Sequence, residues 1–483
     1  METLQRTANR GSVSTGYDID NSLKLEDDNT EGMAKNFTGD GDRRTWTYST
    51  WVKRTEITGS DAFHLFGASY SNIQFMTNDL LRVELYDGSN TRYADLNRVF
   101  RDTSAWYHIV VALDSTQSTA ADRVKIYING VQDTSFNNNT YTNMSQNDQF
   151  DFGSASANYQ FGYYFAGGSN DRRFCGYVAE THYVNGTALT SDSFGEFDSD
   201  TGIWIPKAYS GSHGSKGFYF KFDDSSNLGK DSASSGIGDF TLTNITAADQ
   251  AVDTPTNNFC TLSPLNTENN GGGDVEYTEG ATKAKTLAAD EPASGSMAIT
   301  KGKWYFECKA LSNSEIMAGW GVPNSWGTST DNPGNDEYSF AVHPVGRVYY
   351  YGNSYIDFSP SVSFDTNDII SVAIDADNGF CYWAKNGTYM NSATPTSGAT
   401  GTGGFNYLSG STGANMKIVD GDFLVPAFRV NYYTNSGILL NFGGYTTITI
   451  SSAASDANGY GVFEYAPPSG YYALCTKNLA EYG

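Results

Sequence analysis

The sequence lacks long hydrophobic runs and contains few cysteines. No stretch of 18 apolar residues occurs in its 483 residues, which excludes a membrane-spanning helix. The cysteines are odd in number, widely spaced and free of any C-x-x-C pair: Cys175, Cys260, Cys308, Cys381 and Cys475. A zinc site or a disulfide framework is therefore not expected, and we interpret these residues as small hydrophobes within strands.

Positive charge is also scarce. The chain has 30 Lys and Arg residues against 54 Asp and Glu residues, a formal net charge of −24. Such a chain repels phosphate backbones, so nucleic acid is not an expected partner. The acidic residues are scattered along the chain, which is typical of a solubilising surface. The first residues, METLQRTANRGSVSTG, have no apolar core, and we do not expect a secretory signal there.

Catalytic patterns are missing as well. Retaining glucanases need two carboxyl groups on one face, about 5 Å apart. Glu84 and Asp87 are three residues apart, which places them on opposite faces of a strand, and Asp420 and Asp422 precede a strand. We interpret all four as solvated turn residues. Because the five histidines are isolated and no G-x-S-x-G motif occurs, the sequence predicts no enzyme and no catalytic residue.

Aromatic residues and glycine are abundant, with 33 Tyr, 28 Phe and 51 Gly. Aromatic strands separated by glycine turns give this balance, whereas long amphipathic helices do not. Apolar residues alternate with other residues in three segments, which predicts as core positions Tyr107, Ile109, Val111, Leu113, Val124, Ile126, Ile128, Ile370, Val372 and Ile374. Asn-Gly pairs at 129–130, 185–186 and 386–387 predict tight turns. An all-β fold follows.

Two sets of phrases resemble known families. The run FCGYVAETHYVNGTALTSDSFGEFDSDTGIWIPKAYSGSHGSKGFYFKF, with SLKLEDDNTEGMAKNF and RRTWTYSTWVKRT upstream of it, resembles the LamG/concanavalin-like jelly rolls of marine bacteriophage structural proteins. The phrases KGKWYFECKA, GWGVP, NDIISVAIDADNGFCYWAKNG, LVPAFRV and ILLNFGG resemble a SPRY domain. The resemblance implies two antiparallel β-sandwich (jelly-roll) domains, concanavalin-like then SPRY-like. For the SPRY-like domain it indicates the fold more than the function, because SPRY domains occur in many unrelated contexts.

Turn residues and shifts in composition along the chain suggest five segments. Residues 1–20 are polar and without pattern, and we expect an N-terminal attachment arm there. A jelly roll over 21–223 is followed by a Ser/Gly/Asn-rich connector over 224–300, which also holds early strands of the second sandwich. The SPRY-like domain is expected over 301–444, and a C-terminal extension over 445–483.

Two surface features are candidates for binding. Trp326 and Tyr355 are the glycan-binding candidates, because a sugar ring can stack on an exposed aromatic face. The acidic loop with Asp331, Asp336 and Glu337 offers oxygen ligands suited to a calcium ion, although its spacing matches no EF-hand. The alternative interpretation is that Trp326 and Tyr355 are packing residues and that the acidic loop is merely solvated. No other cofactor is expected.

The resemblance to phage proteins implies a function. We expect a virion structural protein, a tail fibre or surface appendage with a host-adhesion role directed at surface glycans, made in the host bacterial cytoplasm. The alternatives are a capsid decoration or head fibre protein with a purely structural role, and a glycan-degrading enzyme. The expected partners are other virion proteins of the capsid or tail and further copies of the chain, as a homo-oligomer such as a trimer.

Overall fold

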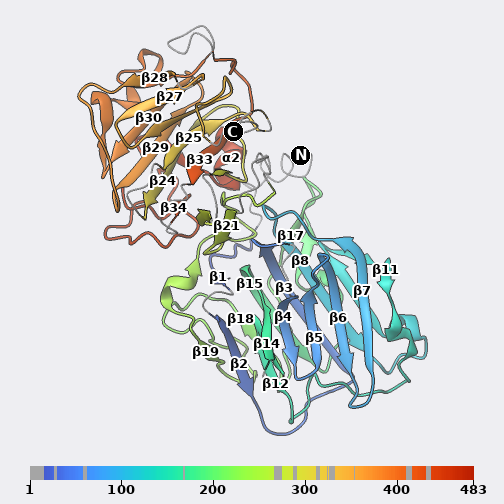
Figure 1. Cartoon of the computed structure of the whole chain (residues 1–483). Helices are drawn as coiled ribbons and strands as arrows, with labels where there is room; N and C mark the ends of the chain where they lie inside the picture. Colours follow the sequence, from blue (N-terminus) through green and yellow to red (C-terminus); the bar gives the residue numbers. More distant parts are fainter. Residues whose placement is uncertain are drawn as a thin grey trace. The chain divides into compact units, whose positions relative to one another are not determined.

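The computed structural model describes residues 16–26, 30–57, 62–166, 169–265, 275–286, 291–311, 316–323, 325, 332–352, 354–408, 416–430 and 437–483. These residues form mainly β-strands (Figure 1). The chain divides into two compact units, one comprising Ser14–Thr256 and the other containing Asn257–Gly483. The division lies within the 224–300 segment that the sequence analysis assigns to a connector. Among the described residues, no helix has the length and apolar composition needed to cross a membrane.

The first unit contains two eight-stranded sheets. The β15 sheet has the order β10-β9-β8-β3-β15-β1-β20, with β18 also paired to β15. Its strands are β1 Ser22–Leu25, β3 Thr45–Arg54, β8 Tyr107–Asp114, β9 Val124–Ile128, β10 Val131–Asp133, β15 Gly176–Asn185, β18 Phe218–Phe220 and β20 Gln250–Ala251. The β6 sheet has the order β11-β7-β6-β5-β4-β12-β2-β19. Its strands are β2 Gly32–Asn36, β4 Phe63–Ala68, β5 Ser71–Phe75, β6 Leu80–Tyr86, β7 Thr91–Val99, β11 Phe136–Asn138, β12 Asn158–Phe161 and β19 Thr241–Thr243.

These two sheets enclose an aromatic core. The ring of Phe66 on β4 lies 5.1 Å from that of Tyr48 on β3 and 5.4 Å from that of Tyr183 on β15, so it joins the two sheets. All the predicted core positions of β8 and β9 belong to this cluster, except that Tyr107 is partly buried and packs against it. Alternation along these strands therefore predicted their core faces correctly.

Shorter elements complete the first unit. Two hairpins pair β13 Tyr163–Ala166 with β14 Ser169–Arg173, and β16 Gly195–Phe197 with β17 Trp204–Pro206. Four 3₁₀ helices are described, η1 Ala120–Asp122, η2 Thr140–Asn143, η3 Ser191–Ser193 and η4 Ala247–Asp249. Phe194 packs with Val110 and Val184 on the face of the β15 sheet that is turned away from the core. Because of this cover, β15 is buried on both faces.

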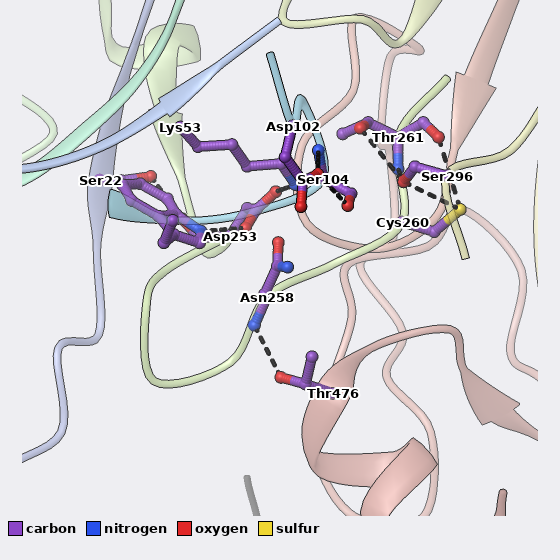
Figure 2. A network of polar contacts seen from close by, with 11 residues as sticks. Ser22, Lys53, Asp102, Ser104, Asp253, Asn258, Cys260, Thr261, Ser296 and Thr476 are labelled. Carbon is purple, nitrogen blue, oxygen red and sulfur yellow. Dashed lines mark hydrogen bonds and ion pairs between the residues drawn. The ribbon is translucent and has the colours of Figure 1, made fainter. Parts of the chain in front are cut away.

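Several polar groups on the covered face are paired. Lys53 of β3 is fully buried, and its Nζ atom lies 2.8 Å from Oδ2 of Asp253 (Figure 2). The other oxygen of this carboxylate accepts a hydrogen bond of 3.0 Å from Trp106 Nε1. The Ser22 hydroxyl donates to the Asp253 backbone carbonyl at 2.6 Å. These contacts attach the segment that follows β20 to β1 and β3.

Lys53→Met should destabilise the first unit by about 3–5 kcal/mol, because the Asp253 carboxylate would remain buried beside an apolar side chain. Denaturant unfolding of the full chain, followed by the fluorescence of its tryptophans, measures this loss. The matched control is Lys125→Met, since the ion pair of Lys125 with Asp122 is solvent-exposed and such pairs contribute about 0–1 kcal/mol. Equal stability of the two variants would contradict the role assigned to Lys53.

The second unit contains a nine-stranded and a six-stranded sheet. The β24 sheet has the order β21-β22-β34-β24-β29-β30-β31, with β32 paired to β30 and β35 to β24. Its strands are β21 Val275–Thr278, β22 Lys283–Thr286, β24 Lys303–Ala310, β29 Ile369–Asp375, β30 Phe380–Lys385, β31 Thr388–Tyr389, β32 Phe405–Asn406, β34 Ile438–Asn441 and β35 Tyr472–Ala473. The β25 sheet has the order β23-β33-β25-β26-β27-β28. Its strands are β23 Glu291–Ser294, β25 Met317–Gly321, β26 Ser339–His343, β27 Arg347–Tyr350, β28 Ser354–Asp357 and β33 Val425–Val430.

The core of the second unit also lies between its sheets. Ile370, Val372 and Ile374 belong to it, as the alternation predicted, together with Trp304 and Trp320. Outside the sheets, the described helices are η5 Met390–Ser392, η6 Pro395–Thr400 and α2 Thr476–Tyr482. The pairing of the described strands is antiparallel except between β24 and β35, which are parallel. An all-β fold of two sandwiches is therefore confirmed.

Two of the three predicted Asn-Gly turns are tight hairpins. Asn129 and Gly130 have φ of 48° and 82°, and Asn386 and Gly387 have φ of 47° and 79°, the left-handed conformations that such turns require. The prediction for Asn185-Gly186 is wrong. Strand β15 ends there, but it pairs with β1, β3 and β18, and the next strand, β16, pairs with β17 instead.

The C-terminal residues cover the β24 sheet. Glu307 of β24 is fully buried and accepts hydrogen bonds from the backbone N–H groups of Glu464 and Tyr465, at 3.0 and 2.8 Å. Asn441 of β34 donates to the same carboxylate at 3.1 Å. At the start of the unit, the Asn258 backbone N–H donates to the Thr476 hydroxyl at the beginning of α2, at 3.0 Å (Figure 2).

The cysteines and the expected arm also have defined positions. All five cysteines are buried and none is in a disulfide, but only Cys308 and Cys381 lie within strands. Residues 1–15 of the expected arm lie outside the described residues. Tyr17 donates a hydrogen bond to Glu180, and the Ile19 backbone N–H donates to the Thr256 hydroxyl at 3.1 Å, so this part of the segment is attached to the first unit.

Candidate glycan-binding surface

Tyr355 is the glycan candidate that the structure describes, whereas Trp326 lies outside the described residues. Tyr355 belongs to β28, which is the last strand of the β25 sheet, and 48% of its surface is exposed. It lies opposite Tyr349 of β27, with 5.7 Å between the two ring centroids. An exposed ring on an edge strand is open to a flat ligand. The glycan-binding role of Tyr355 stays a prediction.

Arg347 lies against the ring of Tyr355. The central carbon of its guanidinium lies 4.1 Å from the centroid of the Tyr355 ring, a cation–π contact. Its Nε atom lies 2.9 Å from Oδ1 of Asp357, the residue opposite it on β28. We name Arg347, Tyr349 and Tyr355 the aromatic strip. It combines two phenol rings and one guanidinium on the two outermost strands of the sheet.

The acidic loop borders the same sheet. Asp336 accepts hydrogen bonds from the Tyr338 backbone N–H at 2.7 Å and from the Ser339 hydroxyl at 3.1 Å, while Glu337 is paired with Lys417. Asp331 lies outside the described residues. The Asp336 carboxylate thus stabilises the loop itself, and the Glu337 carboxylate pairs with a distant segment. No group of three or more His, Cys, Asp or Glu side chains suited to a metal ion occurs in the described part of the chain, and the calcium site stays a prediction.

Glu84 does not lie where the sequence analysis expects it. It is not a solvated turn residue: it belongs to β6, and burial raises the pKa of its carboxyl group, although the nearby guanidinium groups of Arg172 and Arg82 oppose this. The Arg172 Nη1 atom lies 4.0 Å from Oε2 of Glu84. Asp87 follows the strand and accepts the backbone N–H of Ser89 at 2.8 Å, as expected of a turn residue.

The face around Glu84 offers one available carboxylate rather than two. The neighbouring acid, Asp95, is almost fully buried in a bidentate pair with Arg82, at 2.8 and 2.7 Å. Asp422 in the second unit accepts the backbone N–H of Val419 at 2.8 Å and is a turn residue. Hydrolysis of a glycosidic bond needs a second carboxyl group positioned across the bond.

The histidines of the first unit are not isolated, contrary to the sequence analysis. Nδ1 of His182 and Nε2 of His213 are 3.0 Å apart, and the two rings are stacked. His108 accepts a hydrogen bond from Trp204 Nε1 at 3.0 Å and contacts the Ser49 hydroxyl at 2.9 Å. Residues that are distant in sequence thus meet on the covered face of the β15 sheet.

Burial keeps three histidines neutral. Desolvation lowers the pKa of His64 to about 3, of His108 to about 3 and of His213 to about 4. In the unfolded chain a histidine has its ordinary pKa of about 6.5. The unfolded chain therefore binds more protons than the folded chain below pH 6.5, and the first unit loses stability as the pH falls from about 6.5 toward 4.

The stability loss should approach about 1.4 kcal/mol per pH unit for each of these histidines. Denaturant unfolding at a series of pH values measures it, and histidine ring NMR signals give the protonation of each residue. The rings of His64, His108 and His213 should stay neutral down to about pH 5. Protonation of any of them above about pH 6 in the folded protein would contradict the assigned burial.

Comparison with known families agrees with the two sandwiches. The concanavalin A-like lectin/glucanases superfamily matches residues 26–192, and the SPRY domain matches residues 303–442. The chain carries a concanavalin A-like domain and a SPRY domain. The aromatic strip lies in the SPRY domain, and Glu84 and the buried histidines His108 and His182 lie in the concanavalin A-like domain. No curated protein sequence matches the chain.

Several solved structures are similar to parts of the chain. A candidate carbohydrate-binding protein of Bacteroides ovatus is 17% identical, with a TM-score of 0.34, over 47% of this chain and 58% of that one. The human HERC1 SPRY domain is 14% identical, with a TM-score of 0.26, over 35% of this chain and 96% of that one. Stonustoxin is 15% identical, with a TM-score of 0.26, over 38% of this chain, which spans only 27% of the toxin.

Sequence reasoning missed Arg347 as a partner of the Tyr355 ring, because this residue carries no motif. The signal that was available is the alternation of RVYY, which places Arg347 and Tyr349 on one face of a strand, one hairpin turn away from Tyr355.

Proposed function

We propose that this protein is an adhesion protein that binds surface glycans through the aromatic strip of its SPRY domain. The observation that carries the proposal is the exposed Tyr355 ring, which contacts Arg347 and Tyr349 of the neighbouring strand. Rings of this kind stack on the apolar faces of sugars, and guanidinium groups donate hydrogen bonds to sugar oxygens. The SPRY and concanavalin A-like folds are compatible with this role.

The proposal is one of binding rather than catalysis. On the Glu84 face a single carboxyl group is available, since Asp95 is engaged by Arg82. Adhesion requires only an exposed aromatic ring and a few hydrogen-bond donors on each copy of the protein. Many copies on one particle then give firm attachment, because many weak sites act together.

We further propose that the protein is displayed on a bacteriophage virion, as a tail fibre or surface appendage, after synthesis in the host bacterial cytoplasm. The sequence segments of the first domain that resemble phage structural proteins support a location on the virion. A capsid decoration protein without an adhesive role is the alternative, which the aromatic strip does not favour.

Tyr355→Ala should weaken retention on bacterial surface polysaccharides by roughly three- to tenfold, the contribution of one aromatic contact. Retention of the full chain on immobilised capsular and lipopolysaccharide O-chain preparations measures this, with an assay for new reducing ends alongside. Tyr70→Ala is the matched control, since Tyr70 is 57% exposed and lies in the other domain. Unchanged retention by Tyr355→Ala would refute the role of the strip. Reducing ends that form with the wild type but not with Glu84→Gln would establish an enzyme.

The virion role predicts a symmetric homo-oligomer, which we propose to be a trimer, because appendage proteins are repeated around symmetry axes. Native mass spectrometry and light scattering of the purified protein should give three times the chain mass of 52.5 kDa. A strict monomer, both in solution and on purified particles, would disprove this assembly.

A further inference from the structure

A polar groove lies beside the aromatic strip. It has a volume of about 290 Å³, and the side chains that line it include Asn332, Asn335, His343, Arg347, Tyr349 and Arg429. This volume is at the lower end of the range of small-molecule sites, which is about 300–1,000 Å³, so the groove suits one small group such as a single sugar ring.

Strand pairing brings the basic residues of the groove together. Arg429 of β33 is opposite Met317 of β25, and His343 of β26 is opposite Arg347 of β27. Ala318 and Val342 are paired one position further along, so Met317 and His343 are neighbours. One row across four strands thus carries two guanidinium groups and an imidazole on the face turned away from the core.

The loop beside the groove has a fixed position. In the row that adjoins the basic residues, Gly319 pairs with Ala341 and Ala427, and Ala341 pairs in turn with Tyr349. Gly334 of the loop has φ of 95°, and a Cβ atom there would lie 2.5 Å from the Tyr349 carbonyl oxygen. Only glycine lets the loop approach β27 this closely, and the loop brings Asn332 and Asn335 to the rim.

The charge of the groove contrasts with that of the chain. The net charge of the whole protein is −24, yet none of the described residues that line the groove is acidic. Asp357 pairs with Arg347 from the side and is 62% exposed, while Asp336 accepts hydrogen bonds within the loop and Glu337 is paired with Lys417. An anion in the groove would share or replace the exposed Asp357 as the partner of Arg347.

We propose that this groove binds the carboxylate of an acidic sugar, with the next sugar of the chain lying on the aromatic strip. The planar fork of a guanidinium matches a carboxylate with two parallel hydrogen bonds. The contact with the Tyr355 ring holds Arg347 in place before the ligand arrives. Asn332 and Asn335 supply amide groups for ring hydroxyls. This inference deepens the proposed function and rests on it.

The test uses oligomers of galacturonate, glucuronate and mannuronate, each compared with its methyl ester, in calorimetric titrations of the full chain. At least one acid form should bind, and esterification should weaken its binding about tenfold or more, the effect of losing a charge-assisted hydrogen bond. Arg347→Gln should weaken binding of that acid form similarly. The Arg347 side chain is 30% exposed, and melting curves confirm that the variant is folded.

Lys301→Gln is the matched control: it removes an exposed positive charge from the same domain, just before β24 of the other sheet, and should leave binding unchanged. Equal binding of acid and ester, or binding of dextran sulfate but of no uronate, would overturn the carboxylate assignment. Retention of neutral polysaccharides without uronate binding would overturn it too and leave the proposed function intact. Failure of all glycans to bind would overturn both.

Discussion

Burial of both faces of the central strands is the constraint on which the two domains depend. In β15 and β29 every residue is buried, although only alternate side chains can face the core between the sheets. In the same sheets the other face carries Lys53, Glu307, His108 and His182, and each needs a partner because a buried polar group without one is costly. The partners come from distant segments, such as Asp253 for Lys53 and the 464–465 backbone for Glu307. Polar pairing therefore attaches the covering segments to the sheets.

This arrangement restricts the places where a ligand can bind. A face that is already covered has its polar groups engaged, as Glu307 and His108 show. The outermost strands of the β25 sheet differ: among the described strands β28 pairs with β27 alone, and its Tyr355 ring is half exposed. Side chains there can meet a ligand without the removal of a covering segment. The aromatic strip and the groove lie at this margin of the sheet.

The fold could be predicted from the sequence further than the site could. Alternation with a period of two was enough to identify core residues, because a strand has just two faces. Val111 on β8 and Val372 on β29 were predicted in this way, and both lie in the cores. His108 alternates with the predicted core positions and so lies on the opposite face, but its hydrogen-bond partner there, Trp204, lies far along the chain. Arg347 and Arg429 line the same groove only through the pairing order of four strands, which no local pattern reveals.

The negative charge of the chain and the basic groove act over different distances. At physiological ionic strength the Debye length is about 8 Å, so repulsion between the scattered acidic residues and an acidic polysaccharide is largely screened beyond that distance. In the proposed complex a carboxylate would contact Arg347 at hydrogen-bond distance, next to the Tyr355 ring and inside a groove, where screening is weaker. The acidic surface disfavours indiscriminate attachment to polyanions, whereas the groove would favour one geometry. The proposed selectivity for an acidic sugar would then follow from their combination.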